Sequence, residues 1–368
     1  MTTLLMPLAS ARSLLPPFVI FGVTPHYYIS STCLRLMKFA LPQDTYEKID
    51  HRMYHSYQSL VTYFFETYTG TKVYFYGEDL PTDTTENVLY ICNHQSAIDW
   101  SLANFVGIRQ NSIGQIRYVM KELLKYLPFF GPYFMQHGCI FVRRDGKQDT
   151  ELRRRWIRFH DDRVRGYWIV IFPEGTRYTS KKKALIEKSE QAALAAGYEP
   201  FQNVLFPRTK AFELSLEYLG DLDAVYDLTI AFKIPWLPLK SKQLGPSLLE
   251  FVSIFGREVH MHFRRIPAKQ IDGSAEQRKK WLYDTFKEKD RLLDHFYNLQ
   301  SGGTFPGEQR EVPLKQHQVY PYAFFYFALL GVTLATETGR YYYAKAWQFG
   351  AITWILTPLL YRISELLG

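Results

Sequence analysis

From Val73 onward, short apolar runs alternate with longer stretches of helical periodicity. Buried strands are short and apolar, whereas helices extend over roughly ten residues or more, so this alternation predicts strands joined by helices. Such an order builds a parallel or mixed sheet that is covered by helices on both faces. The predicted fold class is therefore α/β, a mixed sheet with flanking helices. The predicted strands are 88–92, 140–142, 167–172, 228–232 and 259–263, and the predicted helices are 96–106, 149–165, 183–196 and 275–297.

Uncharged stretches flank this α/β region on both sides. Residues 13–34 and 316–336 contain no charged side chain, and a third apolar run covers 346–361. A helix needs roughly 20 apolar residues to span a bilayer core, so we expect N-terminal and C-terminal membrane helices, the last two runs forming a hairpin. A tilted or half-inserted helix is the alternative for the first run, which contains prolines. Residues 43–68 have an amphipathic helical pattern that suits core packing or a position on the bilayer surface.

Composition narrows the classes of partner. The formal net charge of +8 favours lipid head groups, phosphorylated substrates or nucleic acid. No nucleic-acid motif accompanies the arginine-rich segment 153–158, so nucleic acid is not an expected partner. Three cysteines without close spacing indicate a reducing compartment and argue against a cysteine-based zinc site. His260 and His262 share one face of a predicted strand, but no third ligand is evident, and no metal site is expected.

A first candidate site follows strand 88–92. His94 lies just after the strand, and Asp99 follows with four residues between them. Ser96 and Asp99 together predict a capping box that opens the next helix. A carboxylate in the first helical turn can fix the tautomer of the imidazole, which leaves the other ring nitrogen to accept a proton from a hydroxyl. On spacing alone, a helix cap is the commoner role for Asp99.

A second candidate site follows strand 167–172, in the segment Phe172-Pro173-Glu174-Gly175-Thr176-Arg177. Gly175 allows a ligand to approach the backbone amides closely, and the guanidinium of Arg177 can bind a phosphate through two parallel hydrogen bonds. A turn with a surface pair of Glu174 and Arg177 is the structural alternative. The two segments together predict a base beside an anion site.

Taken together, the motifs resemble those of the 1-acylglycerol-3-phosphate acyltransferase family. The segment 93–99 resembles its first motif and 172–177 its third, while 138–144 resembles the second and 205–207 the proline-centred fourth. All four motifs occur in the order found in the family. Their residues are most similar to those of the epsilon-type lysophosphatidate acyltransferase branch. The fourth motif departs from the commoner form, because Arg208 and Lys210 replace hydrophobic residues, and this leaves acyl-chain preference open.

The resemblance implies direct acyl transfer without a cofactor or metal, with acyl-CoA as co-substrate. His94 would remove the proton from the 2-hydroxyl of lysophosphatidate (1-acylglycerol 3-phosphate), and Asp99 would orient His94. The alternatives are a remodelling acyltransferase for lysocardiolipin or lysophosphatidylinositol, and a catalytically idle lipid-binding protein; a serine hydrolase is disfavoured because no G-x-S-x-G segment occurs. The implied substrate-binding residues are Arg144, Glu174, Gly175, Thr176 and Arg177, with Asn93, Lys121 and Pro207 as further candidates.

The same interpretation divides the chain into four parts. Residues 1–70 are the N-terminal hydrophobic segment and amphipathic membrane helix, 71–299 the acyltransferase catalytic domain, 300–317 a linker, and 318–368 the C-terminal hydrophobic hairpin. Positive charge follows the first apolar run, so the catalytic domain is expected to face the cytosol, where acyl-CoA is available. The expected location is the endoplasmic reticulum membrane, with the mitochondrial outer membrane as the alternative. The expected partners are acyl-CoA, lysophosphatidic acid and the lipid bilayer.

Overall fold

The computed structural model describes residues 2–81, 85–143, 149–161, 166–234, 245–253, 256–271 and 273–367. The chain forms two compact units, each assembled from segments that are distant in sequence. The first unit takes in Met1–Tyr63, Ile113–Val164 and Lys315–Gly368, and the second takes in Phe64–Ser112 and Arg165–Leu314. The four contiguous parts expected from the sequence stay a prediction.

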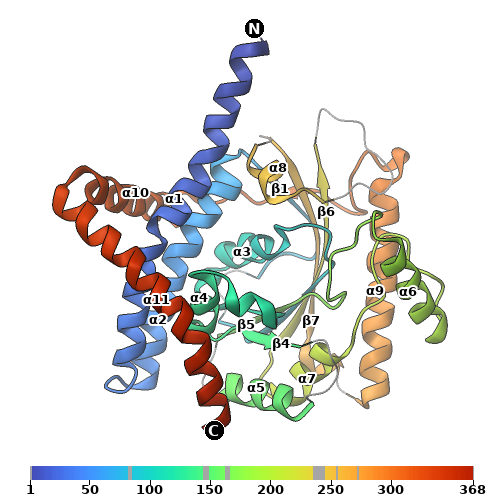
Figure 1. The fold of residues 1–368 in the computed structure, drawn as a ribbon. Helices are drawn as coiled ribbons and strands as arrows, with labels where there is room; N and C mark the ends of the chain where they lie inside the picture. The colour runs from blue at the N-terminus through green and yellow to red at the C-terminus, as the bar shows by residue number, and fades with distance from the viewer. Residues whose placement is uncertain are drawn as a thin grey trace. The chain divides into compact units, whose positions relative to one another are not determined.

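A mixed sheet forms the core of the second unit (Figure 1). Its strand order is β5-β2-β6-β7-β1-β8. β2 pairs in parallel with both β5 and β6, whereas β7 runs antiparallel to β6 and parallel to β1. All five residues of β2 are buried, as expected for a strand in the middle of a covered sheet. The strands are β1 Lys72–Gly77, β2 Val88–Cys92, β5 Trp168–Ile171, β6 Ala224–Lys233, β7 Glu258–Pro267 and β8 Arg310–Glu311.

Helices cover both faces of this sheet. α3 (Asp99–Arg109) lies on one side and α9 (Ala275–Tyr297) on the other (Figure 1). α9 begins with a capping box, in which the Ser274 hydroxyl accepts from the Gln277 amide and the Gln277 side chain accepts from the Ser274 amide. The predicted α/β class, a mixed sheet with flanking helices, is confirmed. The other α-helices of this unit are α6 Lys183–Ala195, α7 Lys210–Tyr218 and α8 Leu248–Ser253.

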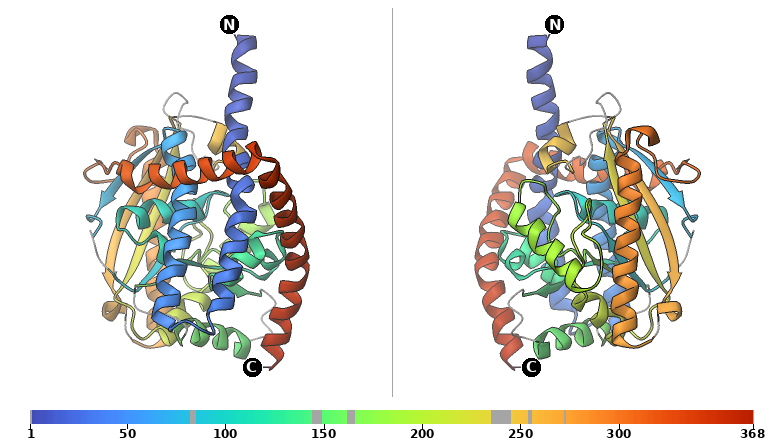
Figure 2. Two further views of the ribbon diagram at one scale, coloured as in Figure 1. Left: turned by 90° about the vertical axis from the view of Figure 1, so that its left-hand side faces the viewer. Right: turned by 90° about the vertical axis from the view of Figure 1, so that its right-hand side faces the viewer.

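The first unit is mainly helical. α1 and α2 lie side by side, and α10 and α11 pack against α1 (Figure 2). Two strands, β3 and β4, pair in parallel in the same unit. The segment with the predicted amphipathic pattern forms α2 and continues as a π-helix over Tyr63–Tyr68. The elements are α1 Thr2–Met37, α2 Gln43–Thr62, β3 Ile116–Lys121, α4 Phe130–Gln136, β4 Ile140–Val142, α5 Asp149–Asp161, α10 Tyr320–Ala335 and α11 Glu337–Leu367.

The expected membrane-spanning helices are not confirmed. Over the parts of the chain that the structure describes, no helix has both the length and the apolar character that crossing a membrane requires. α10 contains 16 residues, fewer than the roughly 20 that a bilayer core takes. α11 is longer, but Glu337, Arg340 and Lys345 lie in its first turns.

A buried polar network joins α1, α2, β3 and the end of α4 in the first unit. One carboxylate oxygen of Asp50 lies 2.8 Å from the Arg117 guanidinium and the other lies 2.8 Å from Nδ1 of His137. Nε2 of His137 lies 2.8 Å from the Tyr27 hydroxyl. Arg117 also lies over the ring of Tyr54, 4.7 Å from its centroid. These charges are buried, so each depends on its partner for the solvation that water would otherwise supply.

Replacing Arg117 by methionine should destabilise the protein, because the Asp50 carboxylate would lose its cationic partner while staying buried. Breaking such a pair costs about 3–5 kcal/mol. Urea denaturation of the purified protein measures this loss in its free energy of unfolding. The matched control is Lys280→Met, which removes an exposed pair with Asp284 and should cost less than about 1 kcal/mol. Equal losses for the two variants would contradict the role given to the network.

Candidate active site

The two predicted site segments meet at one edge of the sheet. His94 follows β2 and Phe172 follows β5, and these strands are parallel neighbours with Ile91 paired to Ile171. The carboxyl ends of parallel strands lie at the same edge, where α/β folds place their functional groups. The imidazole of His94 stacks on the ring of Phe172 with 4.6 Å between centroids. The parallel pairing therefore brings the first and third motifs together.

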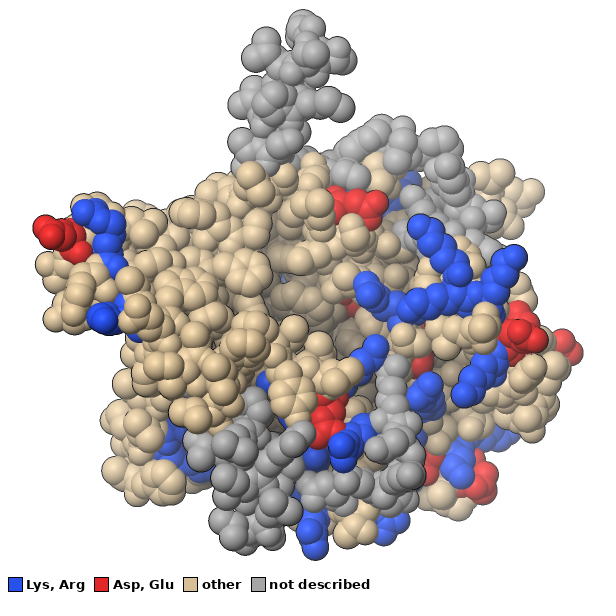
Figure 3. Space-filling model, in the orientation of Figure 1, with Lys and Arg blue, Asp and Glu red and all other residues tan. Residues whose placement is uncertain are grey.

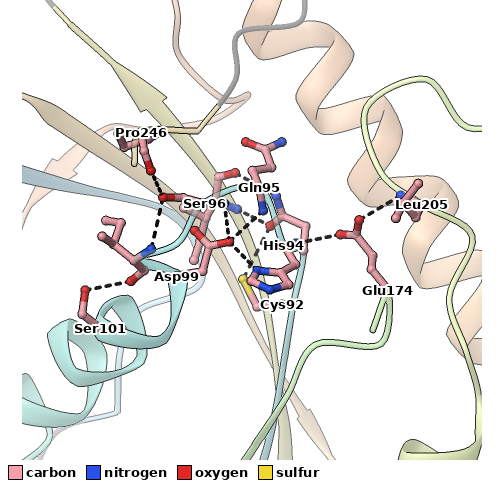
Figure 4. A network of polar contacts seen from close by, with 12 residues as sticks. Cys92, His94, Gln95, Ser96, Asp99, Ser101, Glu174, Leu205 and Pro246 are labelled. Carbon is pink, nitrogen blue, oxygen red and sulfur yellow. Dashed lines mark hydrogen bonds and ion pairs between the residues drawn. The ribbon is translucent and has the colours of Figure 1, made fainter. Parts of the chain in front are cut away.

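His94 and Asp99 form a hydrogen-bonded dyad (Figure 4). Nδ1 of His94 lies 2.8 Å from Oδ2 of Asp99. The carboxylate is acceptor-only when ionised, so Nδ1 carries the proton and the lone pair is left on Nε2. The Asp99 side chain is 1% exposed, whereas the His94 side chain is 23% exposed. The arrangement is that of a general base: the buried carboxylate holds the ring, and the ring is accessible to a substrate.

Asp99 also orders the loop that carries His94. Its Oδ2 accepts hydrogen bonds from the amides of Gln95 and Ser96, at 2.7 and 2.8 Å. The predicted capping box forms only in part: Asp99 accepts from the Ser96 amide, but the Ser96 hydroxyl accepts from the Ile98 amide at 3.2 Å instead of from the Asp99 amide, and it donates to the carbonyl of Pro246. Ile98 is the N-cap residue of α3 and makes no side-chain cap. The carboxylate of Asp99 therefore both holds the loop through two backbone amides and orients the imidazole of His94.

Glu174 connects the first, third and fourth motifs (Figure 4). Its Oε1 accepts from the His94 amide at 2.6 Å, and its Oε2 accepts from the Leu205 amide at 2.9 Å. Burial raises the pKa of this carboxyl well above its usual range, while the two amide hydrogen bonds act in the opposite direction. Both oxygens are bonded to backbone amides, so Glu174 links the loop of the first motif to the fourth motif.

Three further contacts hold the His94 loop. The side-chain amide of Asn93 pairs with the backbone of Ile230 in β6, donating to its carbonyl at 3.0 Å and accepting from its amide at 2.8 Å. The Tyr297 hydroxyl donates to Gln95 at 3.2 Å. Asn93, a candidate substrate contact, is thus buried and bound to a neighbouring strand. The contacts of Tyr297 with Gln95 and of Ser96 with Pro246 join residues more than a hundred positions apart in the sequence. No local sequence pattern predicts them.

The third motif turns sharply beside the dyad. Gly175 has a φ of +67°, in the left-handed region that favours glycine, and its amide donates to the carbonyl of Phe172 at 2.8 Å. The amide of Tyr178 donates to the His94 carbonyl at 2.7 Å, which ties the far end of the motif to the base. Thr176 is half-buried and Arg177 is exposed. Among the described residues, none forms an ion pair with Arg177, so its guanidinium is available to an anion.

The remaining predicted residues fall in different places. Pro207 is buried in the second unit, directly after the segment that Glu174 holds. Lys121 is the last residue of β3 and is exposed in the first unit. Arg144, implied by the resemblance to bind substrate, lies outside the described residues. The structure therefore gathers His94, Asp99 and the segment 174–177 around one sheet edge.

Comparison with known proteins decides the family. The family model described as Acyltransferase matches residues 72–233, and the model described as Acyltransferase C-terminus matches residues 251–327. Over 347 residues the chain is 36% identical to 1-acyl-sn-glycerol-3-phosphate acyltransferase epsilon of Mus musculus, an alignment that covers 93% of this chain and 94% of that protein. The chain belongs to the 1-acyl-sn-glycerol-3-phosphate acyltransferase family.

Two further relatives show the breadth of this acyltransferase family. Probable 1-acyl-sn-glycerol-3-phosphate acyltransferase 5 of Arabidopsis thaliana is 36% identical over 286 residues, covering 77% of this chain and 71% of that protein. Lysocardiolipin acyltransferase 1 of Mus musculus is 28% identical over 273 residues, covering 73% and 69%. The predicted family and its epsilon-type branch are confirmed. Both the dyad and the 174–177 segment of this acyltransferase lie within the first matched region.

Replacing Glu174 by glutamine should slow the acyltransferase, because a carboxamide has one acceptor oxygen and would turn a donor toward one of the two amides. A misplacement of about 1 Å can cost 10²-fold in rate, so kcat should fall by about 10². Steady-state kinetics and circular dichroism on the purified variant test this. Glu187→Gln, at an exposed position of α6, is the matched control. A wild-type kcat in the Glu174 variant would show that the Glu174 carboxylate does not position His94.

Proposed function

We propose that this acyltransferase moves a fatty acyl group from acyl-CoA to the sn-2 hydroxyl of lysophosphatidate, which gives phosphatidate. The names of the relatives support lysophosphatidate as the acceptor. The proposed reaction uses no cofactor or metal, because the base and the leaving group are supplied by the chain and by acyl-CoA. Catalytic roles are proposed for His94 and Asp99, and acceptor binding for Arg177 with Gly175 and Thr176.

The observation that carries this proposal is the dyad beside an exposed guanidinium. Nδ1 of His94 is bonded to Asp99, and Arg177 directly precedes Tyr178, whose amide is bonded to the carbonyl of His94. An acceptor whose phosphate binds Arg177 therefore has its hydroxyl close to the base. Holding both reactants in this way removes much of the entropic barrier to their reaction. The same geometry disfavours a catalytically idle lipid-binding protein.

The proposed chemistry proceeds by direct attack. Nε2 of His94 takes the proton of the 2-hydroxyl while the oxygen forms a bond to the thioester carbonyl carbon. Asp99 stabilises the resulting imidazolium without itself accepting the proton. Collapse of the tetrahedral intermediate breaks the carbon–sulfur bond, and the imidazolium returns the proton to the leaving CoA thiolate. In this proposal, positive charge and the backbone amides of Thr176 and Arg177 stabilise the oxyanion, since the Gly175 amide is already bonded to Phe172.

Other implied residues have narrower roles in this proposal. Glu174, Asn93 and Pro207 support the loops, since the first two bind backbone and the third is buried. Arg144 and Lys121 are proposed to bind phosphate groups of the substrates. The second candidate function is remodelling of lysocardiolipin or lysophosphatidylinositol, favoured by the similarity to lysocardiolipin acyltransferase 1.

An acyl-transfer assay against several lysolipids tests the function. With a long-chain acyl-CoA, we expect lysophosphatidate to be the preferred acceptor over lysophosphatidylinositol and monolysocardiolipin. His94→Ala should lower kcat by about 10²–10⁴, the usual contribution of a general base. His317→Ala, at an exposed histidine, is the control. A preference for lysophosphatidylinositol or monolysocardiolipin, the two phosphodiester acceptors, would favour the remodelling function. Substantial activity in the His94 variant would contradict the proposed mechanism.

We further propose that the first unit binds a lipid bilayer. Large apolar side chains are exposed on α1, α10 and α11, and exposed apolar surface on this scale is typical of membrane or protein contacts. The proposed location is the cytosolic face of the endoplasmic reticulum, where acyl-CoA is available, with the mitochondrial outer membrane as the alternative. The exposed apolar side chains of these helices include Leu14, Phe18, Phe21, Phe324, Phe325, Val332, Tyr342, Ile352 and Ile355.

Vesicle flotation tests the bilayer proposal. The full chain should float with phosphatidylcholine vesicles, and the double variant Phe324→Asp with Phe325→Asp should bind at least about tenfold more weakly, because burying each phenylalanine contributes about 1.5–3 kcal/mol. Leu194→Asp is the matched control: it charges an exposed leucine on α6 of the second unit. A wild-type chain that stays in the lipid-free fraction would contradict bilayer binding.

A further inference from the structure

The fourth motif carries an arginine beside the phosphate-binding turn. Two backbone hydrogen bonds hold this motif against the third: the Leu205 amide donates to Glu174 at 2.9 Å, and the Arg208 amide donates to the carbonyl of Pro173 at 2.8 Å. Because both ends of the segment 205–208 are tied to consecutive residues of the third motif, the Cα of Arg208 is held next to Gly175.

The Arg208 side chain occupies the space that the glycine leaves open. A Cβ added at Gly175 would lie 3.3 Å from Cδ, 3.5 Å from Nε and 3.8 Å from Cζ of Arg208. The guanidinium therefore lies over the backbone of the turn, two residues from Arg177. A glycine at this position serves two purposes, since it allows the positive φ and makes room for the arginine stem.

Both arginines lack a carboxylate among the described residues. Arg177 and Arg208 are exposed, and no described side chain pairs with either guanidinium. Glu174 is the carboxylate nearest in sequence to this turn, but both of its oxygens are bonded to backbone amides. Lys and Arg side chains also gather on the visible face of the second unit (Figure 3). Two positive charges near one turn repel each other, and an anion bound between them would offset this repulsion.

We infer that Arg208 is a second ligand for the acceptor phosphate and that it makes the enzyme selective for a terminal phosphomonoester. This inference rests on the proposed function. A phosphomonoester carries close to two negative charges at neutral pH and has three free oxygens, enough for two guanidinium forks. A phosphodiester carries one charge and two free oxygens, so it gains less from the second arginine. Arg208 thus acts on acceptor choice, whereas His94 acts on the proton.

Steady-state kinetics of purified Arg208→Gln test the inference with two acceptors. For lysophosphatidate, KM should rise about tenfold, which corresponds to about 1.4 kcal/mol of lost binding, and kcat should change by less than about twofold. For lysophosphatidylinositol and for acyl-CoA, KM should change by less than about twofold. Arg208→Lys should fall between the two proteins, because an ammonium keeps the charge but loses the fork.

Lys181→Gln is the matched control, since it removes one exposed positive charge from the loop that follows Arg177. An equal rise of KM in this control would assign the effect to general attraction and overturn the inference. Soluble glycerol 3-phosphate provides a second measurement: its inhibition constant should rise about tenfold in Arg208→Gln, by loss of the same contact. Circular dichroism checks that the variants fold. If Arg208→Gln fails to fold, Arg208→Lys replaces it in the test: a higher KM for lysophosphatidate supports the inference, and an unchanged KM overturns it.

The two proposals fail in different ways. If the wild-type enzyme acylates lysophosphatidate but Arg208→Gln leaves its KM unchanged, the role of Arg208 is overturned and the proposed function stands. If KM rises equally for lysophosphatidate and lysophosphatidylinositol, Arg208 binds phosphate without selecting its class, and the inference is likewise overturned. If the wild-type enzyme does not use lysophosphatidate at all, both proposals are overturned.

Discussion

The two amide hydrogen bonds of the Glu174 carboxylate are the interaction on which the site depends. They join the amide of His94 after β2 to the amide of Leu205 in the fourth motif, through a residue that follows β5. Other contacts anchor the His94 loop to the sheet and to α9, but the Glu174 carboxylate links this loop directly to the fourth motif. These bonds connect His94, the turn at Gly175 and the segment that carries Arg208 into one hydrogen-bonded group. A carboxylate suits this purpose because it offers two acceptor oxygens and no donor.

In the site of the second unit, the negatively charged side chains are buried and the positively charged ones are exposed. The carboxylates of Asp99 and Glu174 are buried and bonded to backbone amides or to the imidazole, whereas the guanidinium groups of Arg177 and Arg208 are exposed. An approaching phosphate therefore meets positive charge without meeting the negative charge that orders the loops. The positive face raises the local concentration of anionic substrates, and salt should weaken this attraction.

The sequence predicts those parts of the molecule whose causes are local. Strand 88–92 and helix 275–297 are predicted with their observed bounds. The strand is an unbroken apolar run, and in the structure the side chain of Ser274 caps the start of the helix. β1 was not predicted, although residues 73–76 form a short apolar and aromatic run. The dyad is recognisable because its two residues are close in sequence. The bond of Tyr297 to Gln95 is not, since only the closed fold brings these side chains together.

The first unit is completed by helices that lie about 300 residues after α1 in the sequence. The Tyr343 hydroxyl donates to the carbonyl of Gly22 at 2.8 Å, and His26 lies 3.0 Å from the Thr333 hydroxyl. α1 therefore emerges from the ribosome some 300 residues before its packing partners in α10 and α11, as the separations of 321 and 307 residues show. Until α10 and α11 have been synthesised, the apolar face of α1 has no intramolecular cover from these helices. A chaperone or a lipid surface can shield that face during the interval, so the proposed membrane contact can precede folding of this unit instead of following it.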